Sequence, residues 1–114
     1  MKKIFVTFLL LVFLIPLAIA KEESTVCANH ILVQSEMDAI KLKSQIKSFE
    51  DFKYYARIYS SCPSGRNGGS LGCFGKGQMV KPFEQAAFGG NLNEVSDPVK
   101  TQFGYHLLWI TDRY

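Results

Sequence analysis

The residue types in this chain that most readily do chemistry are histidine and cysteine. The two histidines, His30 and His106, stand far apart in the sequence, and the three cysteines are Cys27, Cys62 and Cys73. A thiolate beside a histidine is the pairing of covalent catalysis, and clustered cysteines and histidines bind zinc. No CxxC pair occurs and no segment offers an oxyanion hole, so we expect no metal, and a cysteine hydrolase or thiol oxidoreductase is disfavoured.

The second feature that could form a functional site is a glycine-rich apolar segment at residues 71–83, LGCFGKGQMVKPF. Glycine lets the backbone turn sharply and approach a ligand closely. Leu71, Met79, Val80 and Phe83 supply apolar surface that no regular helix or strand period in this segment buries. The segment lacks the Gly-Lys-Ser/Thr and GxGxxG patterns that cradle phosphate. It therefore predicts a groove that binds a polypeptide.

The elements that position these residues follow from local patterns in the first half of the chain. Residues 26–33 are mostly β-branched or apolar and predict a buried strand that carries His30. Two helices follow, each introduced by a serine with an aspartate three residues later. These signals are Ser35 with Asp38, for a helix to about Ile46, and Ser48 with Asp51, for a helix with Phe49, Phe52, Ala56 and Tyr59 on its apolar face.

In the second half, residues 62–77 hold a proline and six glycines, which predicts a loop with one short strand at 71–74. Pro82 suits the first turn of a short helix that runs through residue 88. Strands are expected at 95–99 and 105–111, with a turn between them at Phe103 and Gly104. This order favours an α+β domain with a small, mostly antiparallel sheet.

Four blocks of the sequence resemble the parvulin family of peptidyl-prolyl cis-trans isomerases, or rotamases, in the family's order and spacing. The blocks are YSSCPS at 59–64, GGSLG at 68–72, GQMVKPF at 77–83 and FGYH at 103–106. The resemblance implies the FKBP-like α+β fold: a four-stranded, mostly antiparallel sheet surrounded by helices, in the order βαααβαββ. It also implies non-covalent catalysis of rotation about X-Pro bonds, with no cofactor.

The resemblance further implies the site residues. His30 and His106 match a facing pair of buried histidines, Thr101 matches a hydroxyl that bonds toward them, and Cys62 matches the residue beside the rotating bond. We expect a mainly structural role for the histidine pair and an electrostatic one for Cys62. The residues implied in substrate binding are Leu71, Met79 and Phe83 in the proline pocket, Gln78 in the same block, the backbone at Val80, and Phe103 as an apolar rim.

One family feature is missing: the basic loop after the first strand that selects phosphorylated Ser/Thr-Pro. Val33 is followed by Gln-Ser-Glu-Met-Asp and then a helix, so phosphate-directed specificity is not expected. The alternative function is a catalytically weak chaperone or adaptor that binds extended polypeptides in the same groove. Turnover of a proline-containing tetrapeptide discriminates between the two.

Residues 1–20 have the pattern of a secretory signal peptide: Lys2 and Lys3, a long apolar run, and Ala-Ile-Ala before the expected cleavage site. An uncleaved anchor is the alternative, which the short length and Pro16 disfavour. The remaining 94 residues, 21–114, form one domain that we expect to be exported, to a periplasm, a secretory lumen or the outside, as a monomer without a membrane segment.

The expected partners of this domain follow from its charge and from the groove. Without Lys2 and Lys3, eleven basic residues face ten acidic ones, and no basic run follows a phosphate backbone. Nucleic acid is therefore excluded, and proline-containing or unfolded polypeptides are the expected partners. The odd number of cysteines leaves at least one of them free or paired outside the chain, and spacing does not choose among the three possible pairs.

Overall fold

The computed structural model describes residues 22–114, so the expected signal peptide at 1–20 lies outside the described residues. Within residues 22–114, no helix is long and apolar enough to cross a membrane. The elements in chain order are β1 (Thr25–Val33), α2 (Glu36–Gln45), α3 (Phe49–Tyr59), the 3₁₀ helix η2 (Pro63–Asn67), β2 (Ser70–Gly75), α4 (Lys81–Gly89), β3 (Val99–Thr101) and β4 (Gly104–Arg113).

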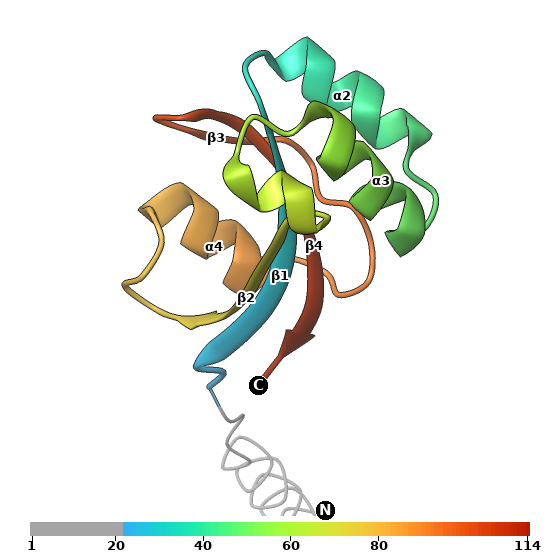
Figure 1. Cartoon of the computed structure of the whole chain (residues 1–114). Helices are drawn as coiled ribbons and strands as arrows, with labels where there is room; N and C mark the ends of the chain where they lie inside the picture. The colour runs from blue at the N-terminus through green and yellow to red at the C-terminus, as the bar shows by residue number, and fades with distance from the viewer. Residues whose placement is uncertain (1–21) are drawn as a thin grey trace, which may run out of the picture.

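The four strands form one antiparallel sheet in the order β2-β1-β4-β3, with β1 and β4 at its centre. Helices α2 and α3 lie on one side of the sheet and α4 lies on the other (Figure 1). The predicted α+β class and the order βαααβαββ are confirmed, with η2 as the third helix. The structure puts a 3₁₀ helix where the composition of residues 63–67 suggests only loop, because Pro63 fixes the first turn.

Both faces of the sheet are covered, which explains why β1 and β4 are apolar runs rather than alternating ones. On one face, Ile31 and Leu107 pack with α2 and α3 around Phe52. On the other, Ala28 and Leu108 pack with α4. Since successive side chains of a strand point to opposite faces, the face that carries Ala28 and Leu108 also carries the two histidines.

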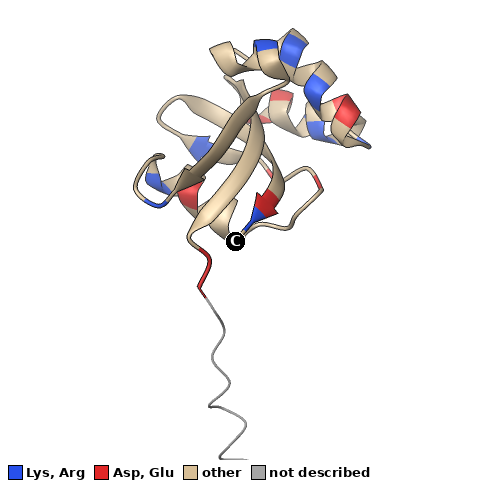
Figure 2. Cartoon of the chain, turned by 60° about the horizontal axis from the view of Figure 1, so that its bottom comes forward, with Lys and Arg blue, Asp and Glu red and all other residues tan. Residues whose placement is uncertain are grey.

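The helices begin as the sequence predicts. The side chains of Ser35 and Ser48 accept hydrogen bonds from the backbone N–H groups of Asp38 and Asp51, each at 3.1 Å. In both helices acidic residues stand in the first turn and a basic residue in the last, which complements the helix dipole. Figure 2 shows both basic and acidic residues on this pair of helices.

The strand expected at 95–99 is wrong in its position, since β3 spans Val99–Thr101. Val95 makes only an isolated bridge to Trp109. Pro98 has no N–H to give to a ladder, and Ser96 takes over the pairing with Leu108 through both its backbone and its hydroxyl, at 2.9 and 2.8 Å. The regular ladder therefore starts only after Pro98.

Tyr59 also differs from the prediction of a buried α3 face. Phe52 and Ala56 are fully buried, whereas Tyr59 is 54% exposed. It stands at the last residue of α3, where its ring stacks on Tyr55 with ring centres 6.1 Å apart. The apolar pattern of α3 therefore extends one turn beyond the part of the helix that the sheet covers.

Candidate active site

A pocket of about 480 Å³ opens on the α4 side of the sheet, between β1, η2 and the connection from β2 to α4. Nine of the ten residues expected to form the site line it: His30, Cys62, Leu71, Gln78, Met79, Val80, Phe83, Phe103 and His106. The tenth, Thr101, lies behind His106. Sequence reasoning missed Leu32, Ser61 and Pro63, although Leu32 follows His30 by the two-residue period of a strand and the other two flank Cys62.

Strand register brings the two histidines together. Leu32 lies opposite His106 and His30 lies opposite Leu108, so the histidines are diagonal neighbours on one face of the β1–β4 pair. Their Nδ1 atoms are 3.0 Å apart, and the rings are inclined by only 18°. One ring must donate its Nδ1–H and the other must accept, so the two imidazoles hold opposite tautomers when both are neutral.

The outer nitrogens of the pair are bound to hydroxyl groups. His30 Nε2 lies 3.0 Å from Ser64 Oγ, and His106 Nε2 lies 2.7 Å from Thr101 Oγ1. Thr101 Oγ1 also accepts the backbone N–H of Phe103 at 3.2 Å. Thr101 is buried, so its own hydroxyl hydrogen needs an acceptor, which His106 Nε2 provides. His106 then donates from Nδ1 to His30, and His30 donates from Nε2 to half-buried Ser64.

Both imidazoles are held neutral. Burial, and to a smaller extent the neighbouring His106, lower the pKa of His30 from its ordinary value near 6.5 to about 4. Burial likewise lowers the pKa of His106. Protonating both Nδ1 atoms would also turn two N–H groups toward each other across 3.0 Å. At neutral pH the pair therefore works as a fixed hydrogen-bonded wall, not as a proton donor to the pocket.

The neutral pair gives a pH dependence of stability. Below pH 6.5 the histidines of the unfolded chain become protonated, whereas those of the folded chain stay neutral. The free energy of unfolding therefore falls as the pH drops toward 4. His30 alone contributes a slope of about 1.4 kcal/mol per pH unit in this window. Urea denaturation at several pH values measures the slope. The chain has two histidines, so NMR titration of their ring protons is a direct check, and midpoints near 6.5 in the folded protein would contradict this expectation.

Phe83 forms the wall between the pocket and the core. Its ring meets His30 and His106 edge-on, with centres 5.6 and 5.1 Å apart and planes inclined by 88° and 75°. Phe83 is only 3% exposed, because it and Ala87, one turn later, form the buried face of α4. The interpretation that no regular period buries Phe83 is thus wrong, while Leu71, Met79 and Val80 are half-buried and contribute surface to the pocket.

Two turns hold the pocket's edges. Gly69 accepts the backbone N–H of His30 at 2.9 Å with φ of +84°, and a Cβ there would lie 2.2 Å from the His30 carbonyl oxygen, so only glycine fits. In the other turn, Gln78 Oε1 accepts the backbone N–H of Gly75 at 2.9 Å. Gln78 therefore closes the turn that precedes Met79, in addition to lining the pocket.

The structure chooses among the possible cysteine pairs. Cys27 and Cys73, opposite each other in β1 and β2, form a disulfide. Cys62, half-buried at the start of η2, is the free cysteine of the described residues. No group of three or more His, Cys, Asp or Glu residues within residues 22–114 could hold a metal ion.

This fold and this site define a rotamase domain of the parvulin type. Residues 19–112 match the family model described as "Rotamase: PPIC-type PPIASE domain", and the chain belongs to this family. It is 51% identical over 87 residues to the foldase protein PrsA of Geobacillus kaustophilus, a match that covers 75% of this chain and 31% of that protein. The chain thus spans about a third of the length of this relative.

Solved structures give the same result. A peptidylprolyl isomerase (PrsA) from Bacillus cereus is 41% identical with a TM-score of 0.75, and the match covers 82% of this chain and 36% of that one. NmPin, the parvuline of Nitrosopumilus maritimus, is 40% identical with a TM-score of 0.70, and the match covers 78% of this chain and 97% of that one. The fold therefore occurs both within longer proteins and as nearly the whole of a chain.

Proposed function

We propose that the domain catalyses cis-trans rotation about X-Pro bonds of polypeptides, with no preference for phosphorylated residues. The observation that carries this proposal is one apolar pocket, shared by Leu71, Met79 and Phe83, set against a neutral histidine pair. The pocket is large enough for a pyrrolidine ring with part of the chain on either side. Family membership and the isomerase described from Bacillus cereus support the same activity.

The pocket has the features that this reaction requires. Rotation about a peptide bond has a barrier of about 18–20 kcal/mol, since amide resonance is lost. Seating the proline ring among apolar side chains strips water from the amide and favours the less polar, twisted state. A thousandfold acceleration needs only about 4 kcal/mol of such preference. No proton transfer is required, which fits two imidazoles already bonded to each other and to two hydroxyls.

Cys62 serves in this proposal as a neighbour of the rotating bond, not as a nucleophile. Cys62→Ser keeps a small polar group in place, so we expect kcat/KM to stay within about tenfold of the wild type, a change of at most ~1.4 kcal/mol. A protease-coupled assay on an Ala-Pro tetrapeptide measures it. Complete loss of activity in a folded Cys62→Ser protein would point to a covalent or acid-base step and would contradict this role.

We further propose that the clients are unfolded polypeptides outside the cytoplasm and that the domain works there as a monomer. The signal-like segment at 1–20 and the Cys27–Cys73 disulfide support export, because disulfides persist in oxidising compartments. The relative named as a foldase supports a role in protein folding. NMR exchange measurements on a panel of X-Pro peptides test the activity. Binding that leaves every exchange rate at its uncatalysed value would instead support the chaperone function.

A further inference from the structure

A second groove lies beside the proline pocket, between α2 and α3. We propose that it binds one large apolar or aromatic side chain of the same polypeptide whose proline is seated in the proline pocket. This inference rests on the proposed function, since it names a further subsite of that substrate. The groove has a volume of about 480 Å³, equal to that of the proline pocket.

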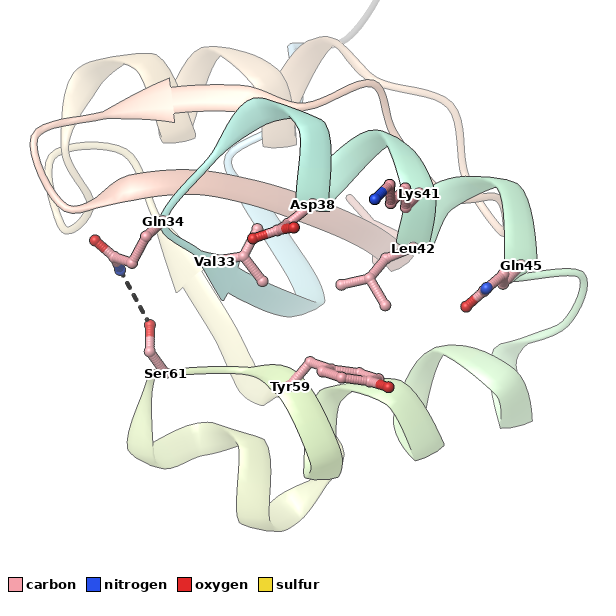
Figure 3. Close-up of a pocket in the computed structure, with 8 residues that line it drawn as sticks. All are labelled: Val33, Gln34, Asp38, Lys41, Leu42, Gln45, Tyr59 and Ser61. Carbon is pink, nitrogen blue, oxygen red and sulfur yellow. Dashed lines mark hydrogen bonds between the residues drawn. The ribbon is translucent and has the colours of Figure 1, made fainter.

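The groove has an apolar floor and a polar rim, as side-chain binding sites have. Val33 and Leu42 are each 7% exposed and form the base. Figure 3 shows Leu42 pointing from α2 toward the ring of Tyr59 at the end of α3. The polar side chains that line the groove are Gln34, Asp38, Lys41, Gln45 and Ser61.

Tyr59 is the residue that most favours an aromatic or apolar occupant. The Tyr59 side chain is 54% exposed at the end of α3 and lines the groove, so its ring is open to contact by a bound side chain. Tyrosine gives a large contact area at a low cost in side-chain entropy, which is why it is enriched in binding sites. The exposed ring forms one side of the groove, and Tyr55 supports it from the other side.

The groove adjoins the proline pocket. Ser61 lines both of them. Gln34 Nε2 donates to Ser61 Oγ at 3.4 Å (Figure 3). It also donates to the carbonyl oxygen of Phe103 at 3.4 Å. Both partners line the proline pocket, while Gln34 itself lines the groove. Ser61 is therefore the common border of the two sites. An extended chain advances about 3.3 Å per residue, so a side chain a few residues from the proline reaches the groove.

Ser61 also lines a second hollow, which is the alternative path for the substrate chain. A hollow of about 340 Å³ between α3 and η2 is lined by Arg57 and Arg66, together with serines, Cys62, Pro63 and Gly65. Neither arginine forms a salt bridge within residues 22–114, so this hollow would favour an acidic residue. It lacks the aliphatic floor of the α2–α3 groove. Unfolded polypeptides expose apolar side chains, so we assign the substrate's path to the α2–α3 groove.

The test uses twelve-residue peptides with one central proline and a single phenylalanine, placed two to five residues before or after it. Peptides with alanine in place of the phenylalanine are the reference. We expect phenylalanine at one or two of these positions to lower the Kd about tenfold in titrations followed by the backbone amide signals of the 15N-labelled domain. Signals of Leu42, Tyr59 and Ser61 should shift together with those of the proline pocket.

Two variants make the assignment specific. Tyr59→Ala should abolish the advantage of the phenylalanine peptide over the alanine peptide. Tyr54→Ala is the matched control, because Tyr54 is on the same helix, is 55% exposed and also packs on Tyr55, but does not line the groove. It should keep the advantage in full.

Three outcomes overturn the inference: no position gives an advantage, the advantage survives Tyr59→Ala, or the shifts go to Arg57 and Arg66 instead of α2. Because binding is measured directly, the result does not depend on catalysis. The exchange rates of the alanine peptides measure catalysis separately. Accelerated exchange without the phenylalanine advantage would overturn the subsite alone. The full binding pattern without accelerated exchange would overturn the isomerase function and leave the subsite standing.

Discussion

Met79→Ala should lower kcat/KM for a proline-containing tetrapeptide at least tenfold, because it removes about 1.5–3 kcal/mol of apolar contact with the proline ring. Met79 is half-buried and lines the pocket after the turn that Gln78 closes. Its side chain is part of the surface that separates the amide from water. The loss should therefore appear in the transition state as well as in substrate binding. The protease-coupled assay on the tetrapeptide measures it.

The chain supplies a matched control in Met37→Ala. Met37 is 60% exposed in α2 and does not line the pocket, so its loss should leave kcat/KM unchanged. Urea denaturation should show that both variants remain folded. An unchanged kcat/KM in folded Met79→Ala would contradict the assignment of Met79 to the proline pocket. Phe83→Ala is a poorer test than the sequence suggests, because truncating a phenylalanine that is 3% exposed costs about 3–5 kcal/mol of stability.

The sequence predicts best those features that local chemistry decides. Ser35 and Ser48 cap helices through bonds to an N–H only three residues later, so this signal lies within one short segment of the sequence. Pro82 in the first turn of α4 is equally local. These signals, with the apolar runs of β1 and β4, place most of the elements and so the α+β class.

Features that depend on contacts distant in the sequence are predicted less well. The first residue of β3 depends on where the chain comes into register with β4. Ser96 binds Leu108 outside the ladder, and the ladder begins at Val99, opposite His106. The exposure of Tyr59 depends on where the sheet stops covering α3. The burial of Phe83 depends on the packing of α4 against the β4 residues Leu108 and His106, which lie far from it in the sequence.

The candidate site shows both cases. The histidines are 76 residues apart, and no periodicity brings them to 3.0 Å. Only the resemblance of the four blocks to a family groups His30 with His106 before the structure is known. The resemblance does not indicate the groove between α2 and α3, since it is formed by Leu42 and Tyr59, which only the packing of two helices brings to one surface.

The disulfide is the other long-range feature, and removing it should have the largest effect on stability. Cys27 and Cys73 are 46 residues apart in the sequence, and closing a loop of that length restricts the unfolded chain by roughly 4 kcal/mol. The double variant Cys27→Ser/Cys73→Ser should therefore lose about 4 kcal/mol in its free energy of unfolding, close to a thousandfold in the folding equilibrium. Urea denaturation measures the loss.

The same bond ties strand β2, at the edge of the sheet, to β1, and β2 carries Leu71 to the pocket. Dithiothreitol should therefore destabilise the wild type to the level of the double variant and have no effect on the double variant itself. Cys62→Ser is the matched control, because it removes a thiol and keeps the bond. Thiol titration of the unfolded protein should find one free thiol before reduction and three after. Three before reduction, in protein kept oxidised, would show that Cys27 and Cys73 are not joined and that packing alone holds β2 in place.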